Sequence, residues 1–206
     1  MSKLKIYGIP ASRAFRCLWM AHELGLDFEL VPIDFATGAH REASYVAVNP
    51  NAKIPAIDDD GLVLWESMAI NLYLAKKHGQ GLWPETLADE ARAWQWSFWV
   101  MTEIEKPLLS ALFHRFLHPK DKRDPAVAEA SLAEIRAPLA VLDAALDGRD
   151  YLLGGAFSVA DLNVAAVLSW ARLARIDLSA TPALDAWLGR CLDRPAAAAA
   201  SPARPD

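Results

Sequence analysis

The sequence predicts a small α/β domain followed by an all-helical domain. Short apolar segments and helical segments alternate up to residue 78, in the order β-α-β-α-β-β-α. A stretch with two glycines and Pro84 follows at 79–88, which is typical of a linker. Every segment beyond it has a helical pattern of apolar residues. We therefore predict an α/β domain at 1–78, a linker at 79–88 and a helical domain at 89–206.

The first domain is predicted to begin with a βαβ unit. The segment KLKIYG (3–8) predicts a short buried strand, and a helix is expected from Ser12 to about Gly25. The segment DFELVPID (27–34) predicts a second strand with an exposed edge. Because a helix joins the two strands over so short a stretch, the strands are expected to be parallel.

A short helix, a hairpin and a longer helix are predicted to complete this domain. The short helix is expected at 41–47, and the strands IPAI and LVLW are joined by DDDG, which supplies hairpin-turn residues. The longer helix covers 67–78. Pro55 opens the first hairpin strand, although a proline cannot donate to a strand ladder. The backbone of Ile54 is therefore expected to serve something other than strand pairing.

The second domain is predicted to contain four helices. The first covers 88–117 and is bent by Pro107, and the second covers 124–146. The third follows FSVADL, in which an S-x-x-D pattern predicts a capping box, and the fourth begins after Thr181. The alanine-rich tail at 196–206 is expected to be loosely held.

The composition argues against several classes of protein. The chain of 206 residues is 53% hydrophobic and 23% charged, with a formal net charge of −5, which is ordinary for a globular protein. No lysine or arginine run indicates a nucleic-acid or membrane partner, and no apolar run approaches the ~18 residues of a membrane span. The N-terminal residues lack the apolar segment of a signal peptide. Cys17 and Cys191 form no CxxC pair or metal-ligand cluster, so we expect buried thiols and a cytoplasmic location.

Five segments resemble, in order and spacing, those of the cytosolic glutathione transferases: YGIPASRAFR, AHRE, KIPAI, ES and FSVADL. The resemblance covers nearly the whole chain and is closest to the serine-type plant and bacterial classes. It implies a thioredoxin-like fold for the first domain. It also implies a detoxification enzyme that conjugates glutathione, its co-substrate, to a hydrophobic electrophile, without a metal and as a homodimer.

The resemblance places glutathione against the first domain. It implies that Pro55 is cis and that the backbone N–H and C=O of Ile54 bind the cysteinyl unit as an added strand would. Ser67 would bind the γ-glutamyl carboxylate at a helix N-terminus, and Glu66 would take the ammonium group. An isolated ES pair is better explained as a helix cap beside a favourable charge. After KIPAI and a hairpin, we favour the binding role.

Other charged residues are assigned by position. Lys53 and His40 are candidates for the glycyl carboxylate, because both lie in loops expected to face the site. The alternative is that they are solvated loop residues, which are common. Arg16 is expected either to support the electrostatics of the site or to lie on the surface, and Tyr7 is expected to pack in the core.

Ser12 is the predicted activating residue. A thiol with a pKa of ~8.5 is only about 3% thiolate at pH 7, and lowering its pKa by two units takes roughly 2.7 kcal/mol. A hydrogen bond to a charged group supplies roughly 1.5–3 kcal/mol, and a helix N-terminus adds roughly 0.3–1 kcal/mol. Ser12 would therefore donate to the glutathione sulfur. The alternative is an ordinary cap of the first helix.

The electrophile is expected to bind between the domains, beside Ala11, Phe35 and Phe113, and Trp65 is a candidate for the dimer interface.

One alternative to a transferase is another glutathione-dependent enzyme on the same fold, namely a peroxidase, isomerase or dehalogenase. The isomerase branch commonly has a serine-cysteine pair at the activating turn, which PASRAFR lacks. The other alternative is a non-catalytic binding or scaffold protein, and the presence of Ser12 as a sulfur donor disfavours it.

Overall fold

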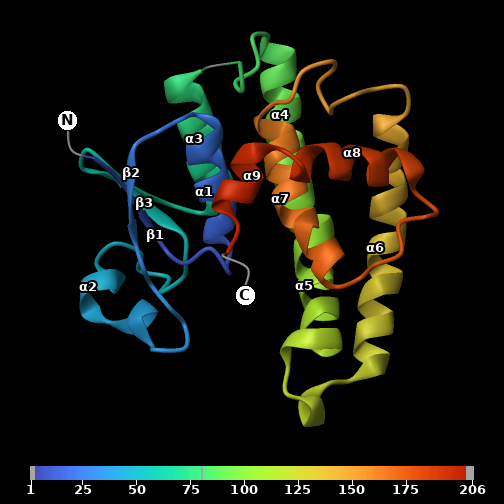
Figure 1. The fold of residues 1–206 in the computed structure, drawn as a ribbon, viewed down its shortest axis with the longest axis horizontal. Coiled ribbons are helices and arrows are strands. Elements are labelled where there is room, and N and C mark those ends of the chain that lie inside the picture. The colour runs from blue at the N-terminus through green and yellow to red at the C-terminus, as the bar shows by residue number, and fades with distance from the viewer. Residues whose placement is uncertain (1–2, 80, 203–206) are drawn as a thin grey trace. The chain divides into compact units, whose positions relative to one another are not determined.

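The computed structural model describes residues 3–79 and 81–202, which form two compact units. The first unit runs to Trp83 and takes in the chain again from Arg194, and the second runs from Pro84 to Asp193. The four-stranded sheet belongs to the first unit, and the second is built of helices (Figure 1). The predicted fold class, an α/β domain followed by a helical domain, is confirmed. No helix in the described part of the chain has the length and apolar character needed to cross a bilayer.

The sheet has the strand order β2-β1-β3-β4. Its strands are β1 (Leu4–Tyr7), β2 (Phe28–Val31), β3 (Ala56–Asp59) and β4 (Leu62–Trp65). Strands β1 and β2 are parallel, as the βαβ unit predicts, whereas β3 pairs antiparallel with both β1 and β4. The pairing of β1 with β3 runs from Lys5 opposite Asp58 to Tyr7 opposite Ala56, so Ile54 lies beyond the paired residues.

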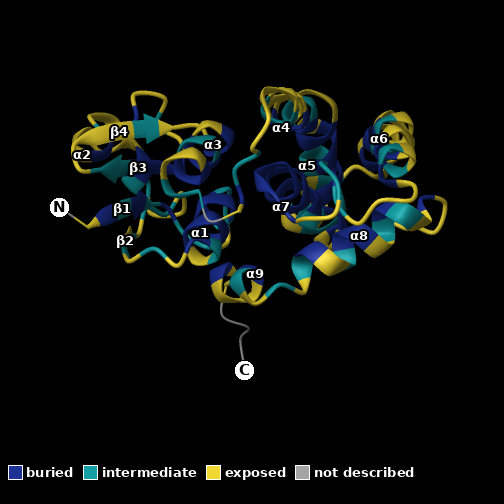
Figure 2. Cartoon of the chain, turned by 90° about the horizontal axis from the view of Figure 1, so that it is seen from above, coloured by how far each residue is buried: buried dark blue, intermediate teal, exposed yellow. Residues whose placement is uncertain are grey.

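The sheet is accompanied by the α-helices α1 (Ala14–Glu23), α2 (Ala43–Val46) and α3 (Ser67–His78) and by the short 3-10 helix η1 (Ala39–Arg41). Helices α1 and α3 pack against each other on one side of the sheet (Figures 1 and 2). The core here is fully buried and includes Ile6 and Ile57 of the sheet and Trp19 of α1. Helix α1 begins two residues later than predicted, because Ser12 lies in the turn that precedes it.

The C-terminal segment returns to the first unit. Helix α9 (Pro195–Ala200) lies against α1, and Ala197 and Ala200 are buried. The Glu23 carboxylate accepts two hydrogen bonds from the Arg194 guanidinium, at 2.6 and 2.7 Å. The prediction of a loosely held tail is therefore wrong for 196–200, and residues 203–206 lie outside the described part. The sequence-based division had placed this segment in the helical domain.

The predicted long helix of the second unit is interrupted. Its segments are α4 (Leu87–Trp99), the π-helical η2 (Val100–Glu105), α5 (Lys106–Leu112) and the π-helical η3 (Phe113–Leu117). Pro107 explains the first interruption, because proline has no N–H to offer the carbonyl of residue 103 and its ring crowds that carbonyl. The remaining helices are α6 (Pro125–Leu146), α7 (Val159–Leu173) and α8 (Pro182–Leu192). Helix α6 continues through Pro138.

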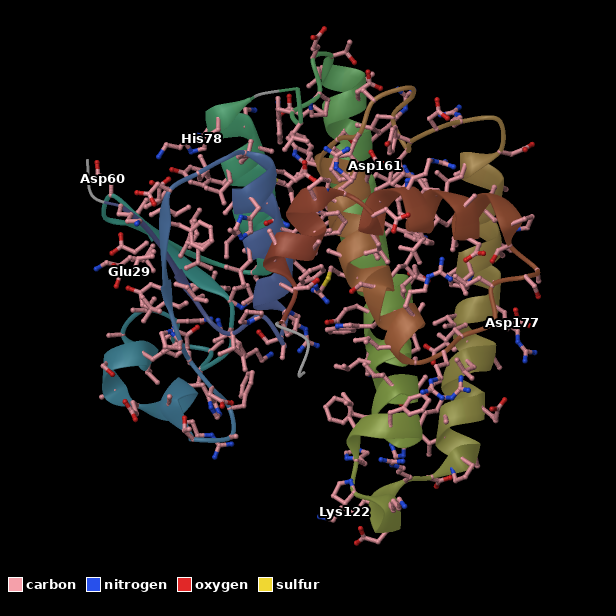
Figure 3. All side chains as sticks on the ribbon, in the orientation of Figure 1. Glu29, Asp60, His78, Lys122, Asp161 and Asp177 are labelled. Carbon is pink, nitrogen blue, oxygen red and sulfur yellow. The ribbon has the colours of Figure 1, made fainter. Side chains whose placement is uncertain are left out.

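A buried carboxylate organises the centre of the second unit. Most of α7 is buried (Figure 2), and Asp161 lies in its first turn (Figure 3). Asp161 accepts hydrogen bonds from the Leu152 amide, the Ser158 amide and hydroxyl, and the Trp187 indole, at 2.8–3.0 Å. The predicted capping box of Ser158 and Asp161 is confirmed. One side chain therefore links the start of α7 to α8 and to the loop before α7.

Replacing Asp161 should destabilise the protein. Asp161→Ala leaves the Leu152 and Trp187 donors buried without an acceptor, so we expect a loss of about 3–5 kcal/mol in the free energy of unfolding. Urea denaturation followed by far-UV circular dichroism measures it. The control is Asp177→Ala, since Asp177 is exposed and accepts from the Ser179 amide. Equal effects of the two substitutions would contradict the central role of Asp161.

Candidate active site

Ser12 lies in the turn before α1, with its hydroxyl already engaged. Its Oγ donates to the carbonyl of Ile9 at 2.6 Å and accepts from the amide of Ala14 at 3.1 Å. The side chain therefore closes the turn that precedes the helix, although the N-cap position itself is Arg13 rather than Ser12. Since a hydroxyl has one proton, Ser12 can donate to a sulfur atom only if it rotates away from Ile9.

Gly8 allows this turn to approach the segment before β3. Its φ is +145°, and a Cβ atom at this position would lie 2.5 Å from the Cβ of Ala14 and 3.5 Å from the Cβ of Ile54. Any side chain here would force the first turn of α1 away from the sheet. A glycine is therefore needed to bring the Ser12 turn and Ile54 together.

The segment before β3 is held at the Lys53 carbonyl. The Ile54–Pro55 peptide bond is cis, as the resemblance implies. The Lys53 carbonyl accepts hydrogen bonds from the Tyr45 hydroxyl and the Asn49 side-chain amide, both at 2.6 Å. Tyr45 and Asn49 belong to no recognisable sequence motif, so the sequence did not predict their part in this segment.

The N-terminus of α3 has a strained backbone at Glu66 and no side chain that caps the helix. Glu66 precedes the helix with φ 74° and ψ 113°, a conformation that costs a non-glycine residue on the order of 1–3 kcal/mol. The Glu66 side chain is exposed and makes no capping hydrogen bond. Ser67 is the first helical residue rather than the cap. The capping explanation of this pair therefore has no support in the geometry, and strain of this kind is typical of functional sites.

A buried arginine lies beneath Ser67. The Arg16 side chain is 1% exposed, and its Nη1 donates to the Ser67 hydroxyl at 3.2 Å. The backbone carbonyl of Arg16 accepts from the Asn71 side chain at 3.2 Å, which further ties α1 to α3. The surface alternative for Arg16 is therefore wrong. A guanidinium and a helix N-terminus together give this end of α3 a positive potential that suits a carboxylate.

The two candidates for the glycyl carboxylate differ in their surroundings. The ring of His40 is buried and lies 4.5 Å from the ring of Phe35, and no residue in the described part of the chain bonds its buried Nδ1. The side chain of Lys53 is exposed.

The three candidates for the electrophile pocket are all exposed. Ala11 lies in the turn before α1, and Phe35 follows β2. Phe113 belongs to the second unit, at the start of η3, with its ring 4.9 Å from that of His118. Each keeps an apolar surface that a hydrophobic ligand could cover.

The two cysteines are not placed to react with a ligand. Cys17 and Cys191 form no disulfide, and both are fully buried, as predicted. Burial raises the pKa of the Cys17 thiol far above its ordinary value, and the nearby Arg16 charge offsets this only in part. Across residues 3–79 and 81–202, no group of three or more histidine, cysteine or acidic side chains is arranged to hold a metal ion.

Comparison with known proteins decides the family. Two family models match: Glutathione S-transferase, N-terminal domain, over residues 2–76, and Glutathione S-transferase, C-terminal domain, over residues 106–195. Glutathione S-transferase 3 of Zea mays is 37% identical over 209 aligned residues, which cover 95% of this chain and 92% of the maize protein. The chain belongs to the glutathione transferase family.

Other comparisons agree on the fold. A solved theta class glutathione S-transferase from Xanthomonas axonopodis pv. citri, with glutathione bound, has a TM-score of 0.91 at 30% identity, covering 99% of both chains. The disulfide-bond oxidoreductase YfcG of Escherichia coli is 34% identical over 94% of this chain and 92% of that protein. The predicted family and the thioredoxin-like fold of the first domain are confirmed. Membership of this transferase family makes the chain an enzyme of glutathione conjugation.

Both cysteines should resist thiol reagents in the native protein. Thiolate is the reactive form, and the raised pKa of Cys17 keeps it protonated at pH 8. Titration with a chromogenic disulfide at pH 8 should detect no fast-reacting thiol, and two after unfolding in guanidinium. One fast thiol in the native protein would show that a cysteine is accessible for chemistry.

Proposed function

We propose that the chain binds glutathione across Ile54, Glu66 and Ser67 and transfers it to a hydrophobic electrophile. The observation that supports this best is the N-terminus of α3. There a strained Glu66, a buried Ser67 hydroxyl and a buried Arg16 guanidinium come together. A structural helix start requires none of these three features, whereas a site for a ligand with both an ammonium and a carboxylate group uses all of them.

The two ends of glutathione are assigned to separate parts of the first unit. The γ-glutamyl carboxylate binds the Ser67 hydroxyl and amide, where the helix dipole and the Arg16 charge both favour an anion. The Glu66 carboxylate takes the γ-glutamyl ammonium. The glycyl carboxylate binds the exposed Lys53 ammonium and the imidazole of His40. The cysteinyl unit between them pairs with the backbone of Ile54, next to Pro55.

Ser12 is proposed to stabilise the thiolate. When glutathione binds, the hydroxyl turns from the Ile9 carbonyl to the sulfur, so the gain of roughly 1.5–3 kcal/mol is reduced by roughly 0.5–1.5 kcal/mol for the lost bond. The net effect corresponds to a fall of about one unit in the thiol pKa. The N-terminus of α1 adds roughly 0.3–1 kcal/mol. The proton leaves to solvent, and the Ser12 hydroxyl remains protonated throughout.

The thiolate then attacks the electrophile. In substitution, a carbon–sulfur bond forms while the leaving group departs with its electron pair. In addition to an activated double bond, the adjacent carbon takes a proton from solvent. Ala11, Phe35 and Phe113 are proposed to contact the apolar part of the electrophile, because each exposes apolar surface.

We also propose that the chain acts as a homodimer in the cytoplasm, without a metal. Strand β4 exposes Leu62, Val63 and Trp65, each to about 40%. Three large apolar side chains on an edge strand favour burial against a partner. A second copy of the chain is the partner that the resemblance implies.

The decisive measurement is the pKa of bound glutathione. Thiolate absorbance near 240 nm, titrated against pH, should give a midpoint at least one unit below that of free glutathione. In Ser12→Ala, the midpoint should rise by about one unit while the dissociation constant changes little. Because a lowered pKa matters only where free thiol is protonated, the loss of rate should be largest at pH 6–7 and nearly absent at pH 9. Identical rate profiles for the two proteins would remove Ser12 from the mechanism.

Ser67→Ala should instead weaken binding. Losing one hydrogen bond to a carboxylate should raise the dissociation constant for glutathione about 10-fold or more. Isothermal titration calorimetry measures it, with Ser44→Ala as the control because Ser44 is an exposed serine of α2. Unchanged affinity in Ser67→Ala would mean that the γ-glutamyl carboxylate lies elsewhere.

Disulfide reduction is the second candidate activity, because YfcG, 34% identical to this chain, is named a disulfide-bond oxidoreductase. Since Cys17 and Cys191 are buried, such a reaction would have to use the sulfur of glutathione itself. Assays of a glutathione mixed disulfide and of an aromatic halide, run side by side, distinguish the two activities. Turnover of the disulfide alone would replace conjugation as the conclusion.

A further inference from the structure

We propose that Tyr45 and Asn49 are positioning residues for glutathione, which together fix the direction of the Ile54 N–H. This inference rests on the proposed function, in which the cysteinyl unit pairs with Ile54. Neither residue touches the ligand in this proposal. Both act through the peptide group that joins Lys53 to Ile54.

The two donors occupy the Lys53 carbonyl completely. The Tyr45 hydroxyl and the Asn49 Nδ2 atom each lie 2.6 Å from the Lys53 oxygen. A carbonyl oxygen has two lone pairs, so two donors use its full capacity. Tyr45 is 3% exposed and Asn49 is 2% exposed, so water does not compete readily for this acceptor. Two short bonds from separate directions hold the plane of the peptide group.

Fixing this oxygen also fixes the neighbouring N–H. The peptide group that joins Lys53 to Ile54 is planar and trans. The Lys53 carbonyl and the Ile54 N–H therefore point in opposite directions. The carbonyl points to Tyr45 and Asn49, which are both buried in the first unit. The Ile54 N–H therefore points away from Tyr45 and Asn49, in the direction from which a peptide would add as a strand and would require a donor. Without the two inner bonds, the peptide group could rotate and the donor would lose its direction.

The donors are themselves held in place. The Tyr45 ring packs in a cluster with Ile54 and Ala56, and its centroid lies 6.0 Å from that of Tyr7. The Oδ1 atom of Asn49 accepts from the Asn51 amide at 3.0 Å, so its Nδ2 atom must be the group that faces Lys53. Burial raises the pKa of Tyr45 to about 12, so its hydroxyl stays protonated at neutral pH. The arrangement is thus pre-formed and does not titrate under assay conditions.

The Tyr45 hydroxyl can be tested apart from the ring. The ring supplies the packing, whereas the hydroxyl supplies the hydrogen bond to Lys53. Tyr45→Phe therefore keeps the core and removes one of the two bonds. Tyr73→Phe is the matched control, because the Tyr73 hydroxyl donates at 2.8 Å to Asp59 in the same unit but makes no contact with Lys53.

The experiment measures affinity and kinetics in both variants. For Tyr45→Phe we expect a rise of about 3- to 10-fold in the dissociation constant and in the KM for glutathione. The kcat at saturating glutathione, the KM for the electrophile and the pKa of bound glutathione should stay at their wild-type values. Tyr73→Phe should leave all of these unchanged. Adding Asn49→Ala to Tyr45→Phe should weaken glutathione binding further, because the carbonyl then has neither donor.

Other outcomes identify what has failed. Wild-type affinity in Tyr45→Phe and in the double variant, with both folded by circular dichroism, would overturn the positioning role. Equal losses of affinity in Tyr45→Phe and Tyr73→Phe would also overturn it, because a general loss of stability would then explain both. Failure of the wild-type protein to bind glutathione would instead overturn the proposed function, and the positioning role with it.

Discussion

The hydrogen bond from the buried Arg16 guanidinium to the Ser67 hydroxyl joins the two helix ends that the site depends on. Arg16 lies in the first turn of α1 and Ser67 opens α3. A buried guanidinium is costly unless its donors are satisfied, so α3 must start where Ser67 can accept one of them. The same pairing places a positive charge where a helix dipole already favours an anion. In the proposed function, packing and ligand recognition thus share one interaction.

The site uses backbone groups as much as side chains. Gly8 lets the turn before α1 approach Ile54, and the Lys53 carbonyl is held from the inner side. A donor fixed by the backbone needs no rotamer to be ordered when a ligand binds, which lowers the entropic cost of association. In the proposed function, the strained backbone of Glu66 serves the same end, since it sets the direction of the Cα–Cβ bond before the ligand arrives.

The sequence by itself determined the elements of the fold, and together with the resemblance it gave the candidate residues of the site. Apolar residues recur every two positions in strands and every 3.6 positions in helices, and this difference separated the two kinds of element. The DDDG turn and the S-x-x-D capping box marked the boundaries of elements through local hydrogen bonding alone. The resemblance added Pro55, Glu66 and Ser67 to the site, because their spacing along the chain is itself the signal. Pro107 marked the interruption of the long helix, although the π-helical form that follows from it was not predicted.

Only the tertiary structure decided which side chains are buried and which partners they find. Arg16 meets Ser67 across 51 residues and Arg194 meets Glu23 across 171, and no local pattern encodes such pairs. For this reason the sequence left two positions open for Arg16, and it predicted neither the packing of the C-terminal segment nor the contacts of Tyr45 and Asn49. The Ser12 proton is bonded to Ile9 because the turn closes that way in space. Local sequence fixes local geometry, whereas distant contacts depend on how the chain packs.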